Sequence, residues 1–529
     1  MFAEVHSLGV HALDGFCVRV EADISAGLPQ FCVVGLPDNA VKESSERVHS
    51  AIKNLGFTYP VSRITVNLVP ADIRKTGPVY DLPIFLALLC ADGQLSSIPG
   101  SYAFIGELSL DGAVRGVSGV LPMAMAAKDA GIEHLFVPAE NAAEAAVIDS
   151  LCVYAVSDAM EVVHHLRGEK TLPPYTALPF DDEDGVSAQD FCDVRGQPEA
   201  RRAMEIAAAG GHNLLLIGPP GTGKSMLAKR MPGILPRMTR EQAMETSRIY
   251  SVAGMLPKGC GLLSHRPFRS PHHSVSATAL AGGGSIPRPG EVSLAHHGVL
   301  FLDELPEFSR LALEILRQPL EDGKVTISRV SGSASFPCEI MLVAAMNPCP
   351  CGYYGHPTRQ CTCSQHAIDR YLQRVSGPLL DRIDLHVEVA PVGYEELSGT
   401  EQSESSAAIL SRVQKARGLQ EARYQGLGFA CNARLSSSAL REYCRLAPEA
   451  EAMFRRVFDN MGLSARAYDR ILKVSRTIAD LAGSDRIETE HPSEATQYRT
   501  LDRKYWFNRQ SPHAPPGAWG FLVHLLEAF

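Results

Sequence analysis

The segment GPPGTGKS at residues 218–225 constrains the fold of this chain more than any other stretch. The apolar run NLLLI precedes it and the helix-like segment SMLAKRM follows it. In such a strand–loop–helix context, backbone N–H groups of the loop curl around the β- and γ-phosphates of a nucleotide at a helix N-terminus. The alternative, a Gly/Pro-rich turn without a ligand, does not account for this context. The predicted nucleotide-binding residues are Gly218, Pro219, Pro220, Gly221, Thr222, Gly223, Lys224 and Ser225.

Side chains for metal binding and hydrolysis are predicted at the end of this loop and after a second apolar strand. Lys224 places a positive charge on the phosphate oxygens, and the Ser225 hydroxyl binds Mg²⁺. The segment GVLFLDE, residues 298–304, ends in two acids. We expect Asp303 to hold Mg²⁺ through water and Glu304 to polarise the attacking water. The alternative is an exposed strand end with two acids, and the phosphate loop upstream argues against it.

Three further polar residues are candidates for sensing or completing this site. Asn347 ends the apolar strand IMLVAAMNP and can position the attacking water near the γ-phosphate. Arg382 follows the turn in GPLLDRIDL; in a ring of subunits it can reach a neighbour's γ-phosphate and stabilise charge in the transition state. The alternative for Arg382 is a surface arginine paired with Asp381 or Asp384. Arg466 opens a helix in GLSARAYDRIL and is a candidate for sensing nucleotide from a helical lid.

Charge and hydropathy limit the cellular setting. Residues 1–189 hold 24 acidic against 11 basic side chains, whereas the rest of the chain is nearly balanced. The balanced part can therefore carry a local basic surface for phosphates. The first thirty residues show no basic start followed by an apolar core, and no apolar run approaches the length needed to span a membrane. We expect a cytoplasmic protein whose thiols stay reduced.

The patterns divide the chain into five regions. Residues 1–167 mix short strands, such as RITVNLVP, with helices, such as DLPIFLALLCA. A Pro-rich acidic linker is expected over 168–189, and the nucleotide-binding α/β domain over 190–395. Helical patterns fill 396–500, and the Pro-interrupted tail 501–529 has no assigned fold.

Four cysteines stand within CPCGYYGHPTRQCTCS, residues 349–364, between Asn347 and Arg382. Two C-x-C pairs separated by nine residues can bring four thiolates together for tetrahedral Zn²⁺, although C-x₂-C is the more usual spacing. A reduced thiol cluster and disulfides are the alternatives, and His356 or His366 can replace one thiol. The expected role is to brace the loop between Asn347 and Arg382. The four candidate ligands are Cys349, Cys351, Cys361 and Cys363.

The order of these motifs resembles that of the AAA+ ATPases. The segments RGQPEARRAMEIAAAGGHNLLLIGPPGTGKSMLAKR and RPFRSPHHSVSATALAGGG are similar to the magnesium-chelatase-like branch. With its N-terminal region, the chain resembles the ComM/YifB subfamily from residue 1 to about residue 500. The resemblance implies a hexameric ring motor driven by ATP and Mg²⁺, with branch-migration helicase activity on DNA in natural transformation.

The resemblance also places two arms in a central pore. The segment KVTISRVSGSASFPC, residues 324–338, alternates apolar and polar side chains like a hairpin, and an insert lies around residues 281–291. Candidates for phosphate contacts with DNA are Lys324, Arg329 and Arg288, with an ordinary solvated hairpin as the alternative. The pairs His272–His273 and His296–His297 are expected in strands, where adjacent side chains point to opposite faces and form hydrogen bonds rather than bind metal.

The N-terminal region resembles the proteolytic domain of Lon-type enzymes, through KTGPVYDLPIFLALL at 75–89 and the stretch 104–141. The resemblance implies an α+β fold. The position of the serine nucleophile is occupied by Val79, and that of the partner lysine falls at about Leu121. Neither side chain can attack a carbonyl or accept a proton. We therefore expect a catalytically empty scaffold or partner-binding collar.

The sequence thus predicts a multidomain α/β protein with three parts: a Lon-like α+β domain, a central AAA+ P-loop domain and a C-terminal helical lid. The leading hypothesis is a homo-hexameric ATPase that remodels single-stranded and branched DNA. A chelatase-type motor acting on a protein partner for metal insertion is one alternative. An ATP-dependent protease is the other, and the missing serine–lysine dyad argues against it.

Overall fold

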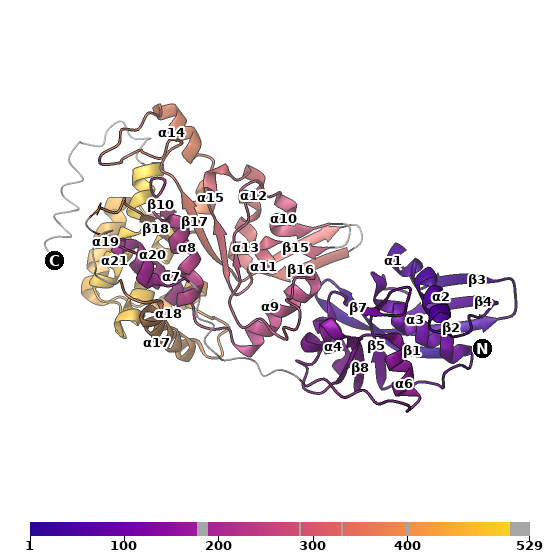
Figure 1. The fold of residues 1–529 in the computed structure, drawn as a ribbon. Coiled ribbons are helices and arrows are strands. Elements are labelled where there is room, and N and C mark those ends of the chain that lie inside the picture. The colour runs from indigo at the N-terminus through magenta and orange to yellow at the C-terminus, as the bar shows by residue number, and fades with distance from the viewer. Residues whose placement is uncertain (177–188, 285–286, 330–331, 395, 397–402, 508–529) are drawn as a thin grey trace.

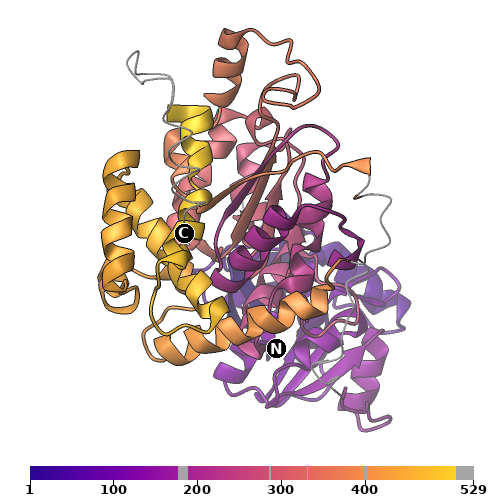
Figure 2. The same cartoon turned by 90° about the vertical axis from the view of Figure 1, so that its left-hand side faces the viewer.

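The computed structural model describes the chain except for residues 177–188, 285–286, 330–331, 395, 397–402 and 508–529. Two sheets and a helical region follow one another along the sequence. Figure 1 shows the N-terminal sheet in indigo and purple, the central sheet beside it, and the yellow C-terminal helices on the far side of the central sheet. Figure 2, turned by 90°, shows the C-terminal helices packed against the central part.

The N-terminal region is built on a seven-stranded mixed sheet with the order β3-β4-β2-β1-β5-β8-β9. Strands β1, β2 and β4 form antiparallel pairs, whereas β1, β5, β8 and β9 run parallel. The strands are β1 (Phe2–His11), β2 (Asp14–Ser25), β3 (Gln30–Val34), β4 (Arg63–Val69), β5 (Tyr102–Phe104), β8 (His134–Pro138) and β9 (Cys152–Val156). A short hairpin adds β6 (Glu107–Leu108) and β7 (Val114–Arg115).

Helices cover this sheet, and the predicted buried helix is one of them. Every residue of α3 except Cys90 is buried, because its sequence is apolar on all sides. The predicted strand RITVNLVP is β4, with Ile64, Val66 and Leu68 facing inward. The helices are α1 (Asn39–Lys42), α2 (Ser44–Asn54), α3 (Asp81–Ala91), α4 (Val120–Asp129), α5 (Ala142–Ala145) and α6 (Ala159–Leu166).

The central region holds a five-stranded sheet, ordered β11-β14-β17-β10-β18, in which all neighbours are parallel. Alternate residues of β10 enter two different cores: Leu214 and Leu216 pack into one, Leu215 and Ile217 into the other. A sheet covered on both faces requires such uninterrupted apolar strands. The strands are β10 (Leu214–Ile217), β11 (Phe268–Arg269), β14 (Val299–Leu302), β17 (Met341–Met346) and β18 (Leu385–Glu388).

Helix α7 precedes the phosphate loop and begins with Pro198, a residue suited to the first helical position. Its C-cap is Gly211, whose φ of 72° is the left-handed conformation in which many helices end. The central helices are α7 (Pro198–Gly210), α8 (Lys224–Arg230), α9 (Arg240–Ala253), α10 (Ala277–Ala281), α11 (Glu291–Leu294), α12 (Arg310–Ile315), α13 (Arg317–Asp322), α14 (Gln365–Leu372) and α15 (Gly377–Leu380).

Two small antiparallel hairpins extend from this region. Strands β15 (Lys324–Arg329) and β16 (Gly332–Pro337) form the hairpin that the alternating pattern predicts. Val325 and Ile327 are buried, whereas Lys324 and Thr326 are exposed. A second pair, β12 (Gly282–Gly283) and β13 (Arg288–Pro289), lies in the predicted insert.

The C-terminal region is helical, as expected, and a buried ionic network stabilises it. Arg476 is 1% exposed, and Asp480 accepts hydrogen bonds from Arg476, Arg423 and Asn432. The helices are α17 (Ser406–Tyr424), α18 (Ser437–Tyr443), α19 (Pro448–Met461), α20 (Ala465–Ala482), α21 (Glu490–Gln497) and α22 (Thr500–Asp502).

The beginning of the tail, which the sequence left unassigned, docks on the central sheet. A π-helical turn, η7 (Arg503–Phe507), follows α22. Lys504 Nζ lies 2.7 Å from a carboxylate oxygen of Glu388 at the end of β18, and Tyr505 is buried. The remainder of the tail lies outside the described residues.

The N-terminal region contacts the central one through α9 and the segment that follows it. The backbone N–H of Gly119 donates to the carbonyl of Ser251 (2.9 Å), and Arg248 contacts Asp14 (3.1 Å). Lys258 lies 2.9 Å from Glu140. Across the described part of the chain, no helix has both the length and the apolar character that crossing a membrane requires.

Candidate ATP-hydrolysis site

The phosphate loop connects the end of β10 to the start of α8, as the sequence predicts. Gly221 and Gly223 have φ angles of 82° and 87°, which L-amino acids with a Cβ rarely adopt. At Gly218 a Cβ would approach the carbonyl oxygen of Val389 to 2.3 Å. Glycine is therefore required for the loop to turn and to pass close to the chain beyond β18.

The Lys224 ammonium group lies inside the loop. Its Nζ donates to the carbonyl oxygens of Gly218 (2.8 Å) and Pro219 (2.7 Å) and to Asn347 Oδ1 (3.2 Å). Burial lowers the pKa of Lys224 to about 8, although Asp303 and Glu304 act in the opposite direction. All three acceptors are neutral, so the ammonium charge remains available to the phosphate oxygens of a nucleotide.

The expected Mg²⁺ ligands are brought together. Ser225, in the first turn of α8, donates a hydrogen bond from Oγ to Asp303 Oδ2 at 2.6 Å, and Asp303 directly follows β14. A hydroxyl and a carboxylate at this point are oxygen ligands of the kind Mg²⁺ prefers. These residues fit an Mg·ATP complex on the phosphate loop.

Glu304 is held by a residue that the sequence did not single out for this site. Its backbone is left-handed (φ 52°), and its N–H donates to Asp303 Oδ1 at 3.0 Å. Glu304 Oε2 lies 3.3 Å from His273 Nδ1. His273 follows β11, the strand next to β14, and the parallel sheet brings the two strand ends to one edge. In the sequence, only the RSPHHS segment marked His273. Residue spacing along the chain does not show that His273 contacts Glu304.

The expectation of strand geometry for both histidine pairs is wrong. Neither pair lies in a strand, and paired rings lie side by side, 4.0 Å apart for His272 and His273 and 3.8 Å for His296 and His297. The second pair converges on Glu245, with His297 Nε2 at 2.9 Å and His296 Nε2 at 3.3 Å. Hydrogen bonding by these histidines agrees with the prediction, but turns rather than strand faces set their directions.

Asn347 directly follows β17 at the edge that carries the loop, and its contact with Lys224 joins it to the site. Strand β17 lies between β10 and β14 in the sheet. The carboxyl ends of these three parallel strands therefore bring together Lys224, Asp303 and Asn347, which are far apart in sequence.

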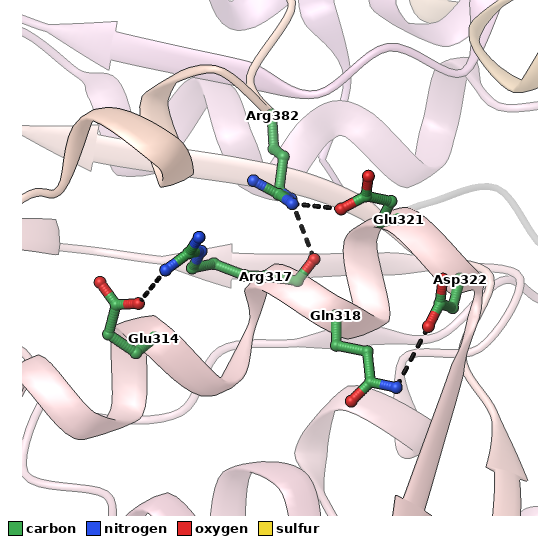
Figure 3. Close-up of a pocket in the computed structure, with 6 residues that line it drawn as sticks. All are labelled: Glu314, Arg317, Gln318, Glu321, Asp322 and Arg382. Carbon is green, nitrogen blue, oxygen red and sulfur yellow. Dashed lines mark hydrogen bonds and ion pairs between the residues drawn. The ribbon is translucent and has the colours of Figure 1, made fainter.

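Arg382 lies in a pocket of about 260 Å³ that α13 borders (Figure 3). Its guanidinium donates to Glu321, to the carbonyl of Arg317 (3.0 Å) and to that of Pro378 (2.7 Å). The alternative pairing with Asp381 or Asp384 is therefore wrong. The pocket is lined by Glu314, Arg317, Gln318, Glu321, Asp322 and Arg382.

Arg466 occupies the first turn of α20, as predicted, and its side chain is 65% exposed. Its Nη1 lies 3.7 Å from Asp381 Oδ2, so it reaches the segment that carries Arg382. Asp384 in the same segment pairs with Arg470 instead, at 2.5 Å. These contacts join the helical region to the turn before β18.

The four thiols of the cysteine cluster (Cys349, Cys351, Cys361 and Cys363) converge, with every Sγ within 4.8 Å of the others. The 13 cysteines of the chain are all free thiols, so the disulfide alternative is wrong. Burial raises the pKa of Cys349 to about 12. His356 Nδ1 accepts hydrogen bonds from the backbone N–H groups of Thr358 and Arg359, so this ring nitrogen faces its own loop. His366 lies in α14.

The candidate DNA-contacting residues lie on the two hairpins. Lys324 begins β15 and is exposed; Arg288 lies in β13 and is also exposed. Arg329 ends β15, and its side chain lies outside the described part of the structure. In the N-terminal region, Val79 and Leu121 are both buried, at 3% and 0% exposure, which fits packing positions.

A phosphate loop on a parallel sheet, with a Ser–Asp pair and an adjacent glutamate at the strand ends, defines a P-loop nucleotide-hydrolase fold. Sequence comparison then gives the family. The family model "Magnesium chelatase, subunit ChlI" matches residues 190–397. Two further models, "Subunit ChlI of Mg-chelatase" and "Magnesium chelatase, subunit ChlI C-terminal", match residues 20–141 and 403–499.

Curated relatives match along nearly the whole chain. Competence protein ComM of Haemophilus influenzae is 45% identical over 504 residues, covering 94% of this chain and 96% of its own length. YifB of Salmonella typhimurium is 44% identical (95% and 97% covered), and YifB of Escherichia coli is 45% identical (94% and 97% covered). The chain belongs to the ComM/YifB subfamily of magnesium-chelatase-like AAA+ ATPases. Membership indicates an ATPase that uses ATP and Mg²⁺.

Proposed function

We propose that this protein is an ATP-driven hexameric ring motor that acts on DNA as a branch-migration helicase. In this role it promotes integration of transforming DNA by homologous recombination. The observation that carries the proposal is the 45% identity to a competence protein over 94% of the chain, combined with an assembled hydrolysis site. The proposed setting is the cytoplasm, and the proposed partners are single-stranded and branched DNA.

The side chains of the site divide the work of hydrolysis. Lys224 holds the β- and γ-phosphate oxygens, while Ser225 and Asp303 hold the metal ion. Mg²⁺ bound there neutralises charge on the phosphates. Glu304, kept near His273, orients and polarises the attacking water, and Asn347 positions it from the end of β17.

Arg382 is proposed to act on the nucleotide of a neighbouring subunit. In the single chain its guanidinium is held by Glu321 and by two carbonyl oxygens. A γ-phosphate presented by the neighbour competes with Glu321 for the same donors, because both are anionic oxygen acceptors. Arg466, which contacts Asp381, is the proposed link between this arginine and the helical lid.

The DNA contacts are proposed on the two hairpins, through Arg288, Lys324 and Arg329. Arg288 and Lys324 are exposed, and cations on hairpin strands can follow the phosphate backbone without reading its sequence. The N-terminal region 1–167 is proposed as a Lon-like collar without the catalytic dyad. The linker 168–189, the ATPase domain 190–395, the lid 396–500 and the tail 501–529 complete the proposed arrangement.

The test begins with ATP turnover on single-stranded, duplex and four-way-junction DNA. We expect DNA to raise the rate, and branch movement to occur in the wild type but not in Glu304→Gln. Binding weakens steeply with salt because phosphate contacts release counterions. ATP turnover indifferent to every form of DNA contradicts the DNA-motor proposal. Lys324→Ala should weaken DNA binding. Lys53→Ala, at an exposed position on α2, is the control for that loss.

The ring is tested by trapping and by mixing. Glu304→Gln with ATP should accumulate an assembled hexamer, because binding persists while hydrolysis stops. Arg382→Ala and Lys224→Ala should each hydrolyse poorly alone, whereas a mixture recovers activity because one interface then holds an intact composite site. If Arg382→Ala alone behaves like the wild type, the proposed interface is wrong.

A chelatase-type motor that remodels a protein partner for metal insertion is the second candidate, because all three matching family models describe magnesium chelatase subunits. ATP turnover stimulated by a protein partner and not by DNA would favour it. The protease alternative has the least support, since Val79 and Leu121 are buried apolar side chains. ATP-dependent degradation of casein is its direct test.

A further inference from the structure

The cysteine cluster has the dimensions of a site for one tetrahedral metal ion. The Sγ–Sγ distances are 3.4 Å for Cys349–Cys351, 3.5 Å for Cys351–Cys361 and 3.7 Å for Cys349–Cys361. A tetrahedron with metal–sulfur bonds near 2.3 Å has sulfur–sulfur edges of about 3.8 Å. A disulfide needs about 2.05 Å, so these spacings suit shared coordination.

Backbone hydrogen bonds also fold the loop that carries the four cysteines. The N–H of Gly352 donates to the carbonyl oxygen of Cys349 (3.0 Å), and that of His356 donates to the carbonyl oxygen of Tyr353 (3.1 Å). The cluster closes a loop of residues 349–363, most of which has no helix or strand of its own.

This loop lies directly against the phosphate loop. Gly352 has φ 84°, and a Cβ there would come within 2.5 Å of Pro220 Cδ and 3.2 Å of Pro220 Cγ. The same loop leaves β17 immediately after Asn347, whose Oδ1 accepts from Lys224. The cluster is therefore linked to the nucleotide site both through space, at Pro220, and along the chain, at Asn347.

We propose that the cysteine cluster holds one structural zinc ion and that the loop it folds supports the phosphate loop at Pro220. Four thiolates suit zinc or a single iron, and the close sulfur spacing excludes a larger iron–sulfur cluster. Without the metal, a loop lacking regular structure has few interactions to keep Gly352 against Pro220. The proposed support of Pro220 depends on the proposed nucleotide site. The proposed zinc site does not depend on it.

The metal is tested on the full chain, purified without chelator. Elemental analysis should find about one zinc per chain and no iron, with no visible absorbance. A mercurial reagent should release that zinc to a chromogenic chelator as the thiols react. The Cys351→Ser/Cys363→Ser variant should lose the zinc, whereas Cys192→Ser, at an exposed cysteine outside the cluster, should keep it. Folded wild-type protein without zinc overturns the metal site, and iron in its place overturns the choice of zinc.

The support of the phosphate loop is tested by a glycine pair. Gly352→Ala should retain zinc but bind a fluorescent ADP analogue about tenfold more weakly, because the methyl group displaces Pro220. Gly355→Ala is the matched control, since Gly355 has φ 77° and open space where its Cβ would stand. Equal affinity of Gly352→Ala and Gly355→Ala for the ADP analogue overturns the proposal that the cysteine loop supports the phosphate loop. Neither measurement uses DNA, so failure here is distinct from failure of the DNA-motor proposal.

Discussion

Ser225 Oγ donates a 2.6 Å hydrogen bond to Asp303 Oδ2, joining the first turn of α8 to the end of β14. The two residues are 78 positions apart in the chain and follow strands that are not neighbours, because β17 lies between β10 and β14. If these residues hold Mg²⁺ as we propose, their contact preforms a pair of oxygen ligands beside the Lys224 ammonium. A preformed pair reduces the reorganisation needed when the metal and the nucleotide bind.

Asp303→Asn should raise the Mg²⁺ concentration required for half-maximal ATP turnover by about tenfold or more, since a neutral amide replaces an anionic ligand. Nucleotide binding in the absence of Mg²⁺ should change little. Titration of ATPase activity with Mg²⁺ measures the effect. Asp129→Asn, at an exposed position at the end of α4, is the control. An unchanged Mg²⁺ requirement in Asp303→Asn would show that this carboxylate does not serve the metal.

His273→Ala should lower kcat by about tenfold while leaving nucleotide affinity nearly unchanged, because Glu304 loses the group that holds its carboxylate. His273→Gln should restore part of the rate, since its amide can still donate a hydrogen bond. The control is His272→Ala, whose ring lies 4.0 Å from that of His273 but whose Nδ1 contacts Ser274. A weaker nucleotide affinity with normal kcat in His273→Ala, or equal losses of kcat in the two alanine variants, would contradict the role of His273 in positioning Glu304.

The sequence predicted the parts of the fold that local patterns encode. The phosphate loop, the apolar strands and the β15–β16 hairpin follow from periodicity and glycine placement, which act over a few residues. Strand order within each sheet was not predicted, because pairing such as β10 with both β17 and β18 depends on tertiary packing.

The candidate site was predictable to the same extent. Asp303, Glu304 and Asn347 were predicted as candidates because each follows an apolar run, and the parallel sheet brings these strand ends to one edge. The His273–Glu304 contact, the Arg382–Glu321 pair and the approach of Gly352 to Pro220 each join separate segments. The spacing of residues in a single sequence does not indicate contacts between distant segments. The alternative partners considered for Arg382 were Asp381 and Asp384, its neighbours in sequence, whereas the fold brings it Glu321 from α13.

Asp480→Ala should destabilise the helical region by about 3–5 kcal/mol, because it leaves the buried Arg476 without the carboxylate that neutralises it. The same carboxylate accepts from Arg423 at 2.6 Å and from Asn432 at 2.8 Å. Chemical denaturation followed by circular dichroism measures the loss. Asp459→Ala, at an exposed position on α19, should change stability by less than about 0.5 kcal/mol. Similar losses in the two variants would mean that the network does not stabilise this region.

ATP affinity should be nearly constant below pH 8 and should fall above it. Burial lowers the pKa of Lys224 to about 8, so the free protein carries the ammonium form below that pH and the neutral amine above it. Bound phosphate favours the ammonium form and raises its pKa; binding above pH 8 therefore takes up a proton, and affinity falls by up to about tenfold per pH unit. Calorimetry in buffers of different ionisation enthalpy measures this uptake. Lys224→Arg keeps its charge throughout and should flatten the profile, whereas Lys229→Ala, at an exposed position on the same helix, should keep the wild-type profile. A wild-type affinity that does not change between pH 7 and 9.5, about 1.5 units above the stated pKa, would contradict the proposed role of the buried ammonium group.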